Sequence, residues 1–118
     1  MTEATELART AALAADSKKA TDVVAFDLTG MSDVCDAIVV CTAPNSHLAD
    51  SVVDEVEERE RTEHGLTPQP LGRRRDRRWV VMDYGSLVVH VFDPEARSFY
   101  RIEKLWGDAP RIELGLAL

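Results

Sequence analysis

The segment from Trp79 to Phe92 constrains the fold more than any other part of the chain. It reads WVVMDYGSLVVHVF, two short runs rich in Val, Phe and Trp on either side of the triplet Tyr84-Gly85-Ser86. Because glycine readily adopts the positive φ that tight turns require, this pattern predicts a β-hairpin. The chain therefore contains a β-sheet in which these two strands are neighbours.

The two faces of this hairpin carry different side chains. If the turn has two residues, paired positions sum to an odd number, so odd positions of the first strand share a face with even positions of the second. One face has only apolar residues and a phenol, and we expect it to point to the core. Its members are Val80, Met82, Tyr84, Leu87, Val89 and Val91. The other face adds a carboxylate and an imidazole, and because burying an unpartnered charge is costly, it is predicted to be at least partly exposed. Its members are Trp79, Val81, Asp83, Val88, His90 and Phe92.

Length and charge limit the class of protein. A chain of 118 residues corresponds to one domain, expected to span residues 1–118. It has 14 basic and 21 acidic residues and a net charge of −7, which opposes binding to phosphate backbones and anionic membranes and favours a basic protein partner. No apolar run approaches the roughly 20 residues of a membrane helix, and the first residues do not resemble a secretory or transit peptide. A cytoplasmic location is therefore expected.

Apolar periodicity predicts two longer helices and one short one. Leu and Ala at helical spacing predict a helix from about residue 3 to residue 18. A second amphipathic helix begins after Asn45 or Ser46, either of which is a suitable N-cap, and ends near Gly65. Its acidic residues are expected to form a solvated face. Asp93-Pro94 combines an N-cap with a first-turn proline, so a short helical turn is expected after the hairpin.

Two further strands precede the hairpin. Val23–Leu28 is one, and Ala37–Thr42 is the other, predicted to be buried on both faces because its run is almost entirely apolar. Their connection is too short for a crossover helix, so we expect them to be antiparallel or joined by an irregular loop. Residues 66–71 contain two prolines and form an edge strand or a loop. The expected fold class is α+β, or mixed α/β, with a single mixed β-sheet of about five strands flanked by helices.

The two cysteines, Cys35 and Cys41, are expected to be reduced core residues. On one extended strand their Cα atoms would be about 20 Å apart, far beyond the reach of a disulfide. A zinc site that adds His47 would have three ligands and no C-x-x-C pair. Neither a metal nor a cofactor is therefore expected.

A set of motifs is distributed over most of the chain. It combines W-x-x-x-D-Y-G in the hairpin, a His five residues after the glycine, Phe99-Tyr100 and a closing I-E-K-L-W. Upstream, residues 22–28 and 32–42 follow in matching order and spacing. In this combination, which covers roughly residues 5–114, the chain resembles the ribosomal silencing factor family, also called Iojap-like proteins.

The resemblance implies a translation repressor without enzymatic activity. Members of this family bind the large ribosomal subunit through ribosomal protein L-fourteen and block joining of the small subunit when nutrients are scarce. Their fold is similar to that of nucleotidyltransferases without the catalytic residues, and several members form homodimers. Carried onto this sequence, the resemblance implies a partner-binding site made of Trp79, Asp83, Tyr84, Gly85, His90, Tyr100, Glu103, Leu105 and Trp106.

Several of these residues also have a purely structural interpretation. Trp79 and Trp106 are suitable core aromatics. His90 is equally well explained as a strand histidine that is hydrogen-bonded to a neighbour such as Asp83. Asp83 is equally well explained as a cap of the hairpin turn.

Two other functions are alternatives. A nucleotide-binding or nucleotidyltransferase-like enzyme would use paired carboxylates such as Asp36 and Asp83 to hold Mg²⁺, but the chain has no P-loop or dinucleotide fingerprint. A small RNA-binding module would use the arginine cluster with exposed aromatics, but the net charge of −7 opposes a broad basic face. The cluster is expected to be a solvated loop or a minor contact to ribosomal RNA. It comprises Arg73, Arg74, Arg75, Arg77 and Arg78.

Overall fold

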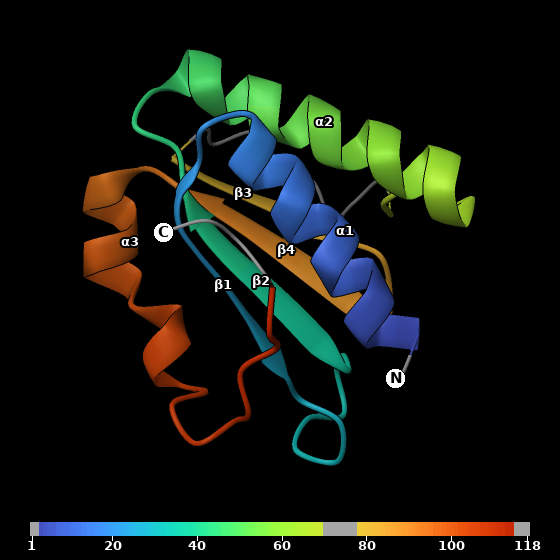
Figure 1. The fold of residues 1–118 in the computed structure, drawn as a ribbon. Coiled ribbons are helices and arrows are strands. Elements are labelled where there is room, and N and C mark those ends of the chain that lie inside the picture. The colour runs from blue at the N-terminus through green and yellow to red at the C-terminus, as the bar shows by residue number, and fades with distance from the viewer. Residues whose placement is uncertain (1–2, 70–77, 115–118) are drawn as a thin grey trace.

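The computed structural model describes residues 3–69 and 78–114. Its elements are, in chain order, α1 (Glu3–Ser17), β1 (Thr21–Asp27), β2 (Ala37–Thr42), α2 (Ser46–His64), β3 (Trp79–Asp83), β4 (Leu87–Phe92), α3 (Pro94–Tyr100) and the 3₁₀ helix η1 (Ile102–Lys104). The described strands form one sheet, with α1 and α2 on one face and α3 and η1 on the other (Figure 1). None of the described helices is long and apolar enough to cross a membrane.

The four described strands are ordered β1-β2-β4-β3. β1 and β2 are antiparallel, which is one of the two arrangements expected from their short connection. β2 and β4 are parallel, and β3 and β4 form the antiparallel hairpin. The mixed α+β class is confirmed, although four strands are described instead of about five. The proline-rich candidate for the additional strand has no regular structure from residue 66 to 69, and residues 70–71 lie outside the described residues. It still follows the sheet edge, because the backbone N–H of Gln69 donates to the carbonyl of Asp83 (2.7 Å).

β2 lies inside the sheet, and all of its residues are buried, as predicted. Its side chains alternate between two cores. Val39 and Cys41 pack in the larger core beneath α1 and α2. Ile38 and Val40 pack in a smaller core on the side of α3. A strand of this kind requires cover on both faces, and the two helix layers supply it.

The hairpin has the predicted register. The N–H of Tyr84 donates to the carbonyl of Leu87 (2.8 Å), so Gly85 and Ser86 form a two-residue turn. Gly85 has a φ of 85°, which is the conformation that favours glycine. Paired positions sum to an odd number along β3 and β4. The face expected to point to the core lies entirely in the larger core, which confirms that prediction.

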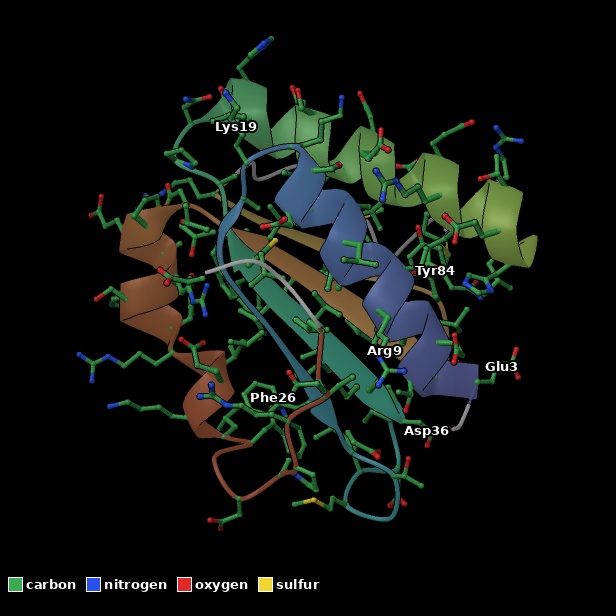
Figure 2. The ribbon with its side chains drawn as sticks, viewed as in Figure 1. Glu3, Arg9, Lys19, Phe26, Asp36 and Tyr84 are labelled. Carbon is green, nitrogen blue, oxygen red and sulfur yellow. The ribbon has the colours of Figure 1, made fainter. Side chains whose placement is uncertain are left out.

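The second face of the hairpin is more buried than predicted. Most of its members are half-buried, as expected, but Val88 and Phe92 are buried. The reason is the cover from α3, because Phe92 packs in the smaller core with Phe26 of β1 and Ala96 of α3. Figure 2 shows Phe26 on this side of the sheet and Tyr84 on the side of α1 and α2. The sequence predicted a short helix here but did not predict which face it covers.

The helix ends follow the predicted caps. Asn45 Oδ1 accepts a hydrogen bond from a backbone N–H in the first turn of α2 (2.8 Å), and Gly65 closes that helix with a φ of 69°. Asp93 Oδ1 accepts a hydrogen bond from the N–H of Ala96 (2.6 Å), and Pro94 is the first residue of α3. Asp93 follows β4 directly, so this cap determines where α3 leaves the sheet.

Glu60 is a carboxyl group on the packed face of α2 and not on the solvated face where it was expected. It shares that face with Val53 and Val56. Its side chain is fully buried, and neither carboxyl oxygen has a hydrogen-bond partner in the described part of the chain. Burial raises the pKa of Glu60 from 4.5 to about 8, with a smaller contribution from the Glu63 carboxylate. The core therefore accommodates this group in its neutral form.

Relative to the wild type, Glu60→Gln is expected to gain stability as the pH rises. The unfolded chain releases the Glu60 proton near pH 4.5 and the folded chain near pH 8, so the free energy of unfolding falls as pH rises between these values. The amide does not titrate. Relative to the wild type, the free energy of unfolding of the variant should therefore rise by about 1–3 kcal/mol between pH 4.5 and pH 8. Urea denaturation measures it. Asp54→Asn, an exposed change on the same helix, is the control, and an equal response of the two variants contradicts the prediction.

Candidate functional site

Aromatic rings gather where β3 and β4 meet α3. Trp79 stacks on Phe92 with ring centroids 5.1 Å apart and contacts the ring of Tyr100 at 4.6 Å. Phe99 meets Tyr100 edge-on at 5.0 Å. Such pairs each contribute about 0.5–1.5 kcal/mol beyond the area they bury. With His90, whose ring lies 6.0 Å from that of Trp79, these residues form what we call the aromatic cluster, and it joins α3 to the hairpin.

A hydrogen bond orients the central ring of this cluster. The indole Nε1–H of Trp79 donates to Nδ1 of His90 (3.1 Å). Because Nδ1 accepts this bond, the imidazole is neutral and its proton is on Nε2. Burial lowers the pKa of His90 from 6.5 to about 4, which favours the same neutral form. The interpretation of His90 as a hydrogen-bonded strand histidine is confirmed, but its partner is Trp79 and not Asp83.

A cavity of about 310 Å³ opens beside the aromatic cluster. Its walls are formed by Arg78, Trp79, Glu95, Ala96, Phe99 and Tyr100. One wall is aromatic and the other is ionic, because Arg78 pairs with Asp93 (Nε to Oδ2, 3.1 Å) and with Glu95 (Nη2 to Oε2, 3.5 Å). An apolar recess with a charged rim is the usual form of a surface that binds another protein.

Three large apolar side chains on α3 and just after η1 are exposed to water, and we call them the apolar patch. Phe99 is 78% exposed, Tyr100 49% and Leu105 76%. In the described part of the chain, the other exposed large apolar residues are scattered over α1 and the loop after β1. A single exposed apolar residue is normal, but several on α3 and just after η1 indicate an interaction surface.

The structure places part of the predicted site at this end of the molecule. The predicted residues found here are Trp79, His90, Tyr100, Glu103, Leu105 and Trp106. Trp106 is half-buried and packs against the smaller core, so it has a structural role and an accessible surface. Glu103 forms an ion pair with Arg97 (Oε1 to Nε, 3.2 Å).

The other predicted site residues form the turn at the opposite end of the hairpin. Asp83 is separated from Trp79 by the length of β3, about 13 Å at 3.3 Å per residue. Tyr84 is only 8% exposed and belongs to the larger core. Asp83 Oδ1 accepts a hydrogen bond from the N–H of Gly85 (2.8 Å), which confirms the interpretation of Asp83 as a cap of the turn. These three residues were grouped with the others because a family motif contains residues that build the fold as well as residues that bind.

The described residues show no group suited to hold a metal ion, and the two thiols are not suited to act as nucleophiles. No group of three or more His, Cys, Asp and Glu side chains in the described ranges is placed to hold a metal ion. Asp83, one of the two carboxylates considered for Mg²⁺, holds the hairpin turn. Cys35 and Cys41 are buried free thiols, and burial raises the pKa of both, that of Cys41 to about 12. Both thiols are therefore protonated and unreactive at neutral pH.

Two residues of this region, Phe99 and Arg97, were not predicted as site residues. Phe99 belongs to the motifs, and its exposure has a sequence signal: adjacent residues of a short helix, such as Phe99 and Tyr100, point in different directions and do not both face the core. Arg97 donates to the carbonyl of Asp22 and to Oγ1 of Thr42, which are 75 and 55 residues away in the sequence. No local pattern identifies contacts of that kind.

Comparison with known proteins adds an independent result. The model of a protein family described as "Ribosomal silencing factor during starvation" matches residues 1–117. The chain belongs to the ribosomal silencing factor family. A ribosomal silencing factor of Bacillus subtilis is 36% identical over 108 residues, which cover 92% of this chain and 91% of that protein. One from Halalkalibacterium halodurans is 38% identical over 109 residues, 92% of each chain. The family resemblance predicted from the motifs is thus confirmed.

Solved structures confirm the fold. A crystal structure from Bacillus halodurans has a TM-score of 0.75 and 35% identity, covering 92% of this chain and 98% of that one. A crystal structure from Chromobacterium violaceum has a TM-score of 0.80 at 24% identity, covering 98% of this chain and 95% of that one. The ribosomal silencing factor family is named for a regulatory role in translation and not for a catalysed reaction.

His90→Asn is expected to reduce the sensitivity of the fold to acid. His90 has a pKa near 6.5 when unfolded and about 4 when folded, so the unfolded state binds the extra proton and the free energy of unfolding falls as pH drops through this interval. The free energy of unfolding of the wild type should fall by on the order of 2 kcal/mol between pH 6.5 and pH 4. Asn retains an acceptor for the Trp79 indole without titrating. Urea denaturation at pH 6.5 and at pH 4 measures this loss of unfolding free energy in the wild type and in His90→Asn. The exposed change His47→Asn is the control. Parallel pH profiles for the wild type and His90→Asn would exclude this role of His90.

Proposed function

We propose that this protein represses translation by binding the large ribosomal subunit through ribosomal protein L-fourteen, which blocks joining of the small subunit under nutrient limitation. Membership of the ribosomal silencing factor family supports the ribosomal role. The motif resemblance supports the particular partner. The observation that carries the proposal to residues of this chain is the exposure of Phe99, Tyr100 and Leu105, the apolar patch.

Trp79 and Tyr100 are suited to anchor a protein partner. Buried or half-buried aromatic residues at the centre of an interface supply most of its binding free energy, surrounded by residues that exclude water. Trp79 is held by stacking and by its hydrogen bond to His90 before any partner arrives. A side chain that is already ordered loses little conformational entropy on binding, so more of the contact energy is retained as affinity.

The charge of the protein supports a basic protein partner. A net charge of −7 attracts a basic surface and repels exposed phosphate backbone, which directs docking to ribosomal protein instead of bare ribosomal RNA. Arg78 is held in ion pairs with Asp93 and Glu95 at the rim of the recess. Its proposed minor contact with ribosomal RNA stays a prediction. The same holds for Arg73, Arg74, Arg75 and Arg77, which lie outside the described residues.

Repression through this surface requires only that the protein occupy the face used by the small subunit. An interface of about 1,600 Å² in total is sufficient for specific binding of two proteins. A folded domain bound there excludes the small subunit from the same volume. This mechanism needs no catalytic group, and it places the protein in the cytoplasm, where the subunits join.

The homodimer implied by the resemblance stays a prediction, and the structure limits where it would form. The outer edge of β1 is partly covered, because Asp27 N–H donates to the carbonyl of Pro110 (2.8 Å) and Ile112 N–H donates to that of Ala25 (2.9 Å). A covered edge does not pair readily with a second sheet. Between the β1 edge and the apolar patch, we propose the apolar patch for self-association, where it would compete with ribosome binding.

Leu105→Ala and Phe99→Ala are expected to weaken binding to isolated large subunits without unfolding the protein. Both side chains are largely exposed, so their removal leaves the cores intact. Removing an interface residue of this kind costs about 1–2 kcal/mol, or roughly a fivefold to thirtyfold increase in Kd. Co-sedimentation of the purified protein with large subunits measures the Kd.

Leu13→Ala is the matched control, because Leu13 is also exposed (42%) but lies on α1, across the sheet from the patch. It should bind as the wild type does. Wild-type affinity of both patch variants would contradict the assignment of the surface, and the absence of any wild-type binding would contradict the proposed partner.

The wild type is also expected to lower the yield of joined ribosomes when it is added to large subunits before small subunits. The reason is steric exclusion, so the inhibition should saturate with occupancy of the large subunit. Sucrose-gradient profiles at increasing protein concentration measure it. If binding saturates while the subunits join normally, the large subunit remains the partner, but obstruction is ruled out as the mechanism.

A further inference from the structure

A second recess lies on the other side of α3 and has a different character. Its volume is about 290 Å³, and it is bounded by α3, η1 and residues of β1 and β2. Its lining is formed by Asp22, Thr42, Pro94, Arg97, Ser98, Arg101, Glu103 and Lys104. We call it the basic pocket, because three of these side chains are cations.

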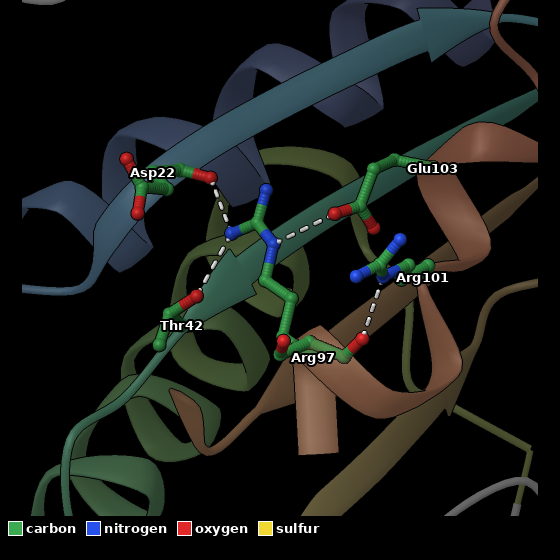
Figure 3. Close-up of polar contacts among 6 residues, drawn as sticks. Asp22, Thr42, Arg97, Arg101 and Glu103 are labelled. Atoms are coloured by element: carbon green, nitrogen blue, oxygen red, sulfur yellow. Dashed lines mark hydrogen bonds and ion pairs between the residues drawn. The ribbon is translucent and has the colours of Figure 1, made fainter. Parts of the chain in front are cut away.

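Arg97 lines the basic pocket, and Figure 3 shows its guanidinium between Asp22, Thr42 and Glu103. Its side chain is only 13% exposed. Its Nη1 donates to the carbonyl of Asp22 (2.6 Å) and to Oγ1 of Thr42 (2.9 Å), and its Nε donates to Oε1 of Glu103 (3.2 Å). Among the described residues, nothing accepts a hydrogen bond from Nη2. The guanidinium is therefore held rigidly while one of its donor nitrogens is unused.

The remaining charges leave the basic pocket positive. Glu103 is paired with Arg97, and Asp22 presents its backbone carbonyl to Arg97 while its carboxylate points away (Figure 3). Toward the described residues, Arg101 donates a side-chain hydrogen bond from Nε alone, to the carbonyl of Ser98 (2.9 Å). The ammonium of Lys104 has no hydrogen bond or ion pair in the described part of the chain. With three cations and two carboxylates in its lining, the pocket has a net positive charge on a protein of net charge −7.

The backbone around the basic pocket is strained. Asp22 has a φ of 50° and Arg101 a φ of 48°, and Lys19 is the remaining described non-glycine residue with positive φ. Such conformations cost about 1–3 kcal/mol each and gather at binding sites more often than elsewhere. Here they bring the Asp22 carbonyl to Arg97 and turn the chain from α3 into η1.

We propose that the basic pocket binds the phosphate group of a small phosphorylated metabolite. Arginine and lysine donors converge on it, and charge-assisted hydrogen bonds to phosphate oxygens are the strongest that these groups make. A volume of about 290 Å³ is at the lower limit of small-ligand sites.

Titration of the ¹⁵N-labelled full chain with inorganic phosphate and with ribose 5-phosphate tests this inference. Ribose and sodium chloride at matched ionic strength are the controls. We expect saturable shifts of the backbone amides of Ser98, Arg101 and Lys104, with Kd at or below about 1 mM for ribose 5-phosphate. Tighter binding of ribose 5-phosphate than of inorganic phosphate supports a phosphorylated metabolite as the ligand, and equal binding overturns it in favour of free phosphate.

Lys104→Gln and Arg101→Gln should each weaken ribose 5-phosphate binding about tenfold, because each removes a charge-assisted contact. Neither change breaks a contact of the guanidinium of Arg97, and circular dichroism verifies the fold. Lys18→Gln, an exposed change at the end of α1, should have no effect. Shifts that do not saturate by about 10 mM, or that sodium chloride reproduces, would overturn the proposal without any variant. Equal affinity in the Lys104, Arg101 and Lys18 variants would overturn it as well.

Discussion

The parallel pairing of β2 with β4 is the constraint on which the rest of the structure depends. It places two apolar strands in the middle of a four-stranded sheet, and strands in that position must be covered on both faces. The two covers are unequal. α1 and α2 are long and close the larger core, whereas α3 and η1 are short and close a smaller one. A seven-residue helix has few positions that face the sheet, so part of its apolar surface remains exposed.

The candidate site follows from this imbalance. Ala96 of α3 is buried against Phe92, and the aromatic residues at the end of the helix then project over the edge of the hairpin. Tyr100 contacts Trp79, and Phe99 is left in water. The contact that attaches α3 to the sheet is thus continuous with the surface proposed to attach the protein to its partner. A partner that binds there adds to a packing arrangement that already exists.

Local rules predicted much of the fold from the sequence. Parity along the hairpin assigned Val89 to the core side, and the Asp93-Pro94 pair located the start of α3. Long-range packing decided the rest. Phe92 is buried because α3 covers it, and the pattern of a seven-residue helix is too short to show which of its faces packs on the sheet. The inclusion of Tyr84 in the site was wrong about its exposure because a motif does not separate residues that build a turn from residues that bind. Arg97 was missed because its partners are distant in sequence.

α3 also relates the two surfaces to each other. Phe99 and Tyr100 line the cavity beside the aromatic cluster, while Arg97 and Arg101 line the basic pocket. Arg97 connects the helix to β1, β2 and η1, so a ligand that engages its free nitrogen would hold α3 more firmly against the sheet. Because both surfaces are formed by α3, a change in how this helix packs would affect both of them.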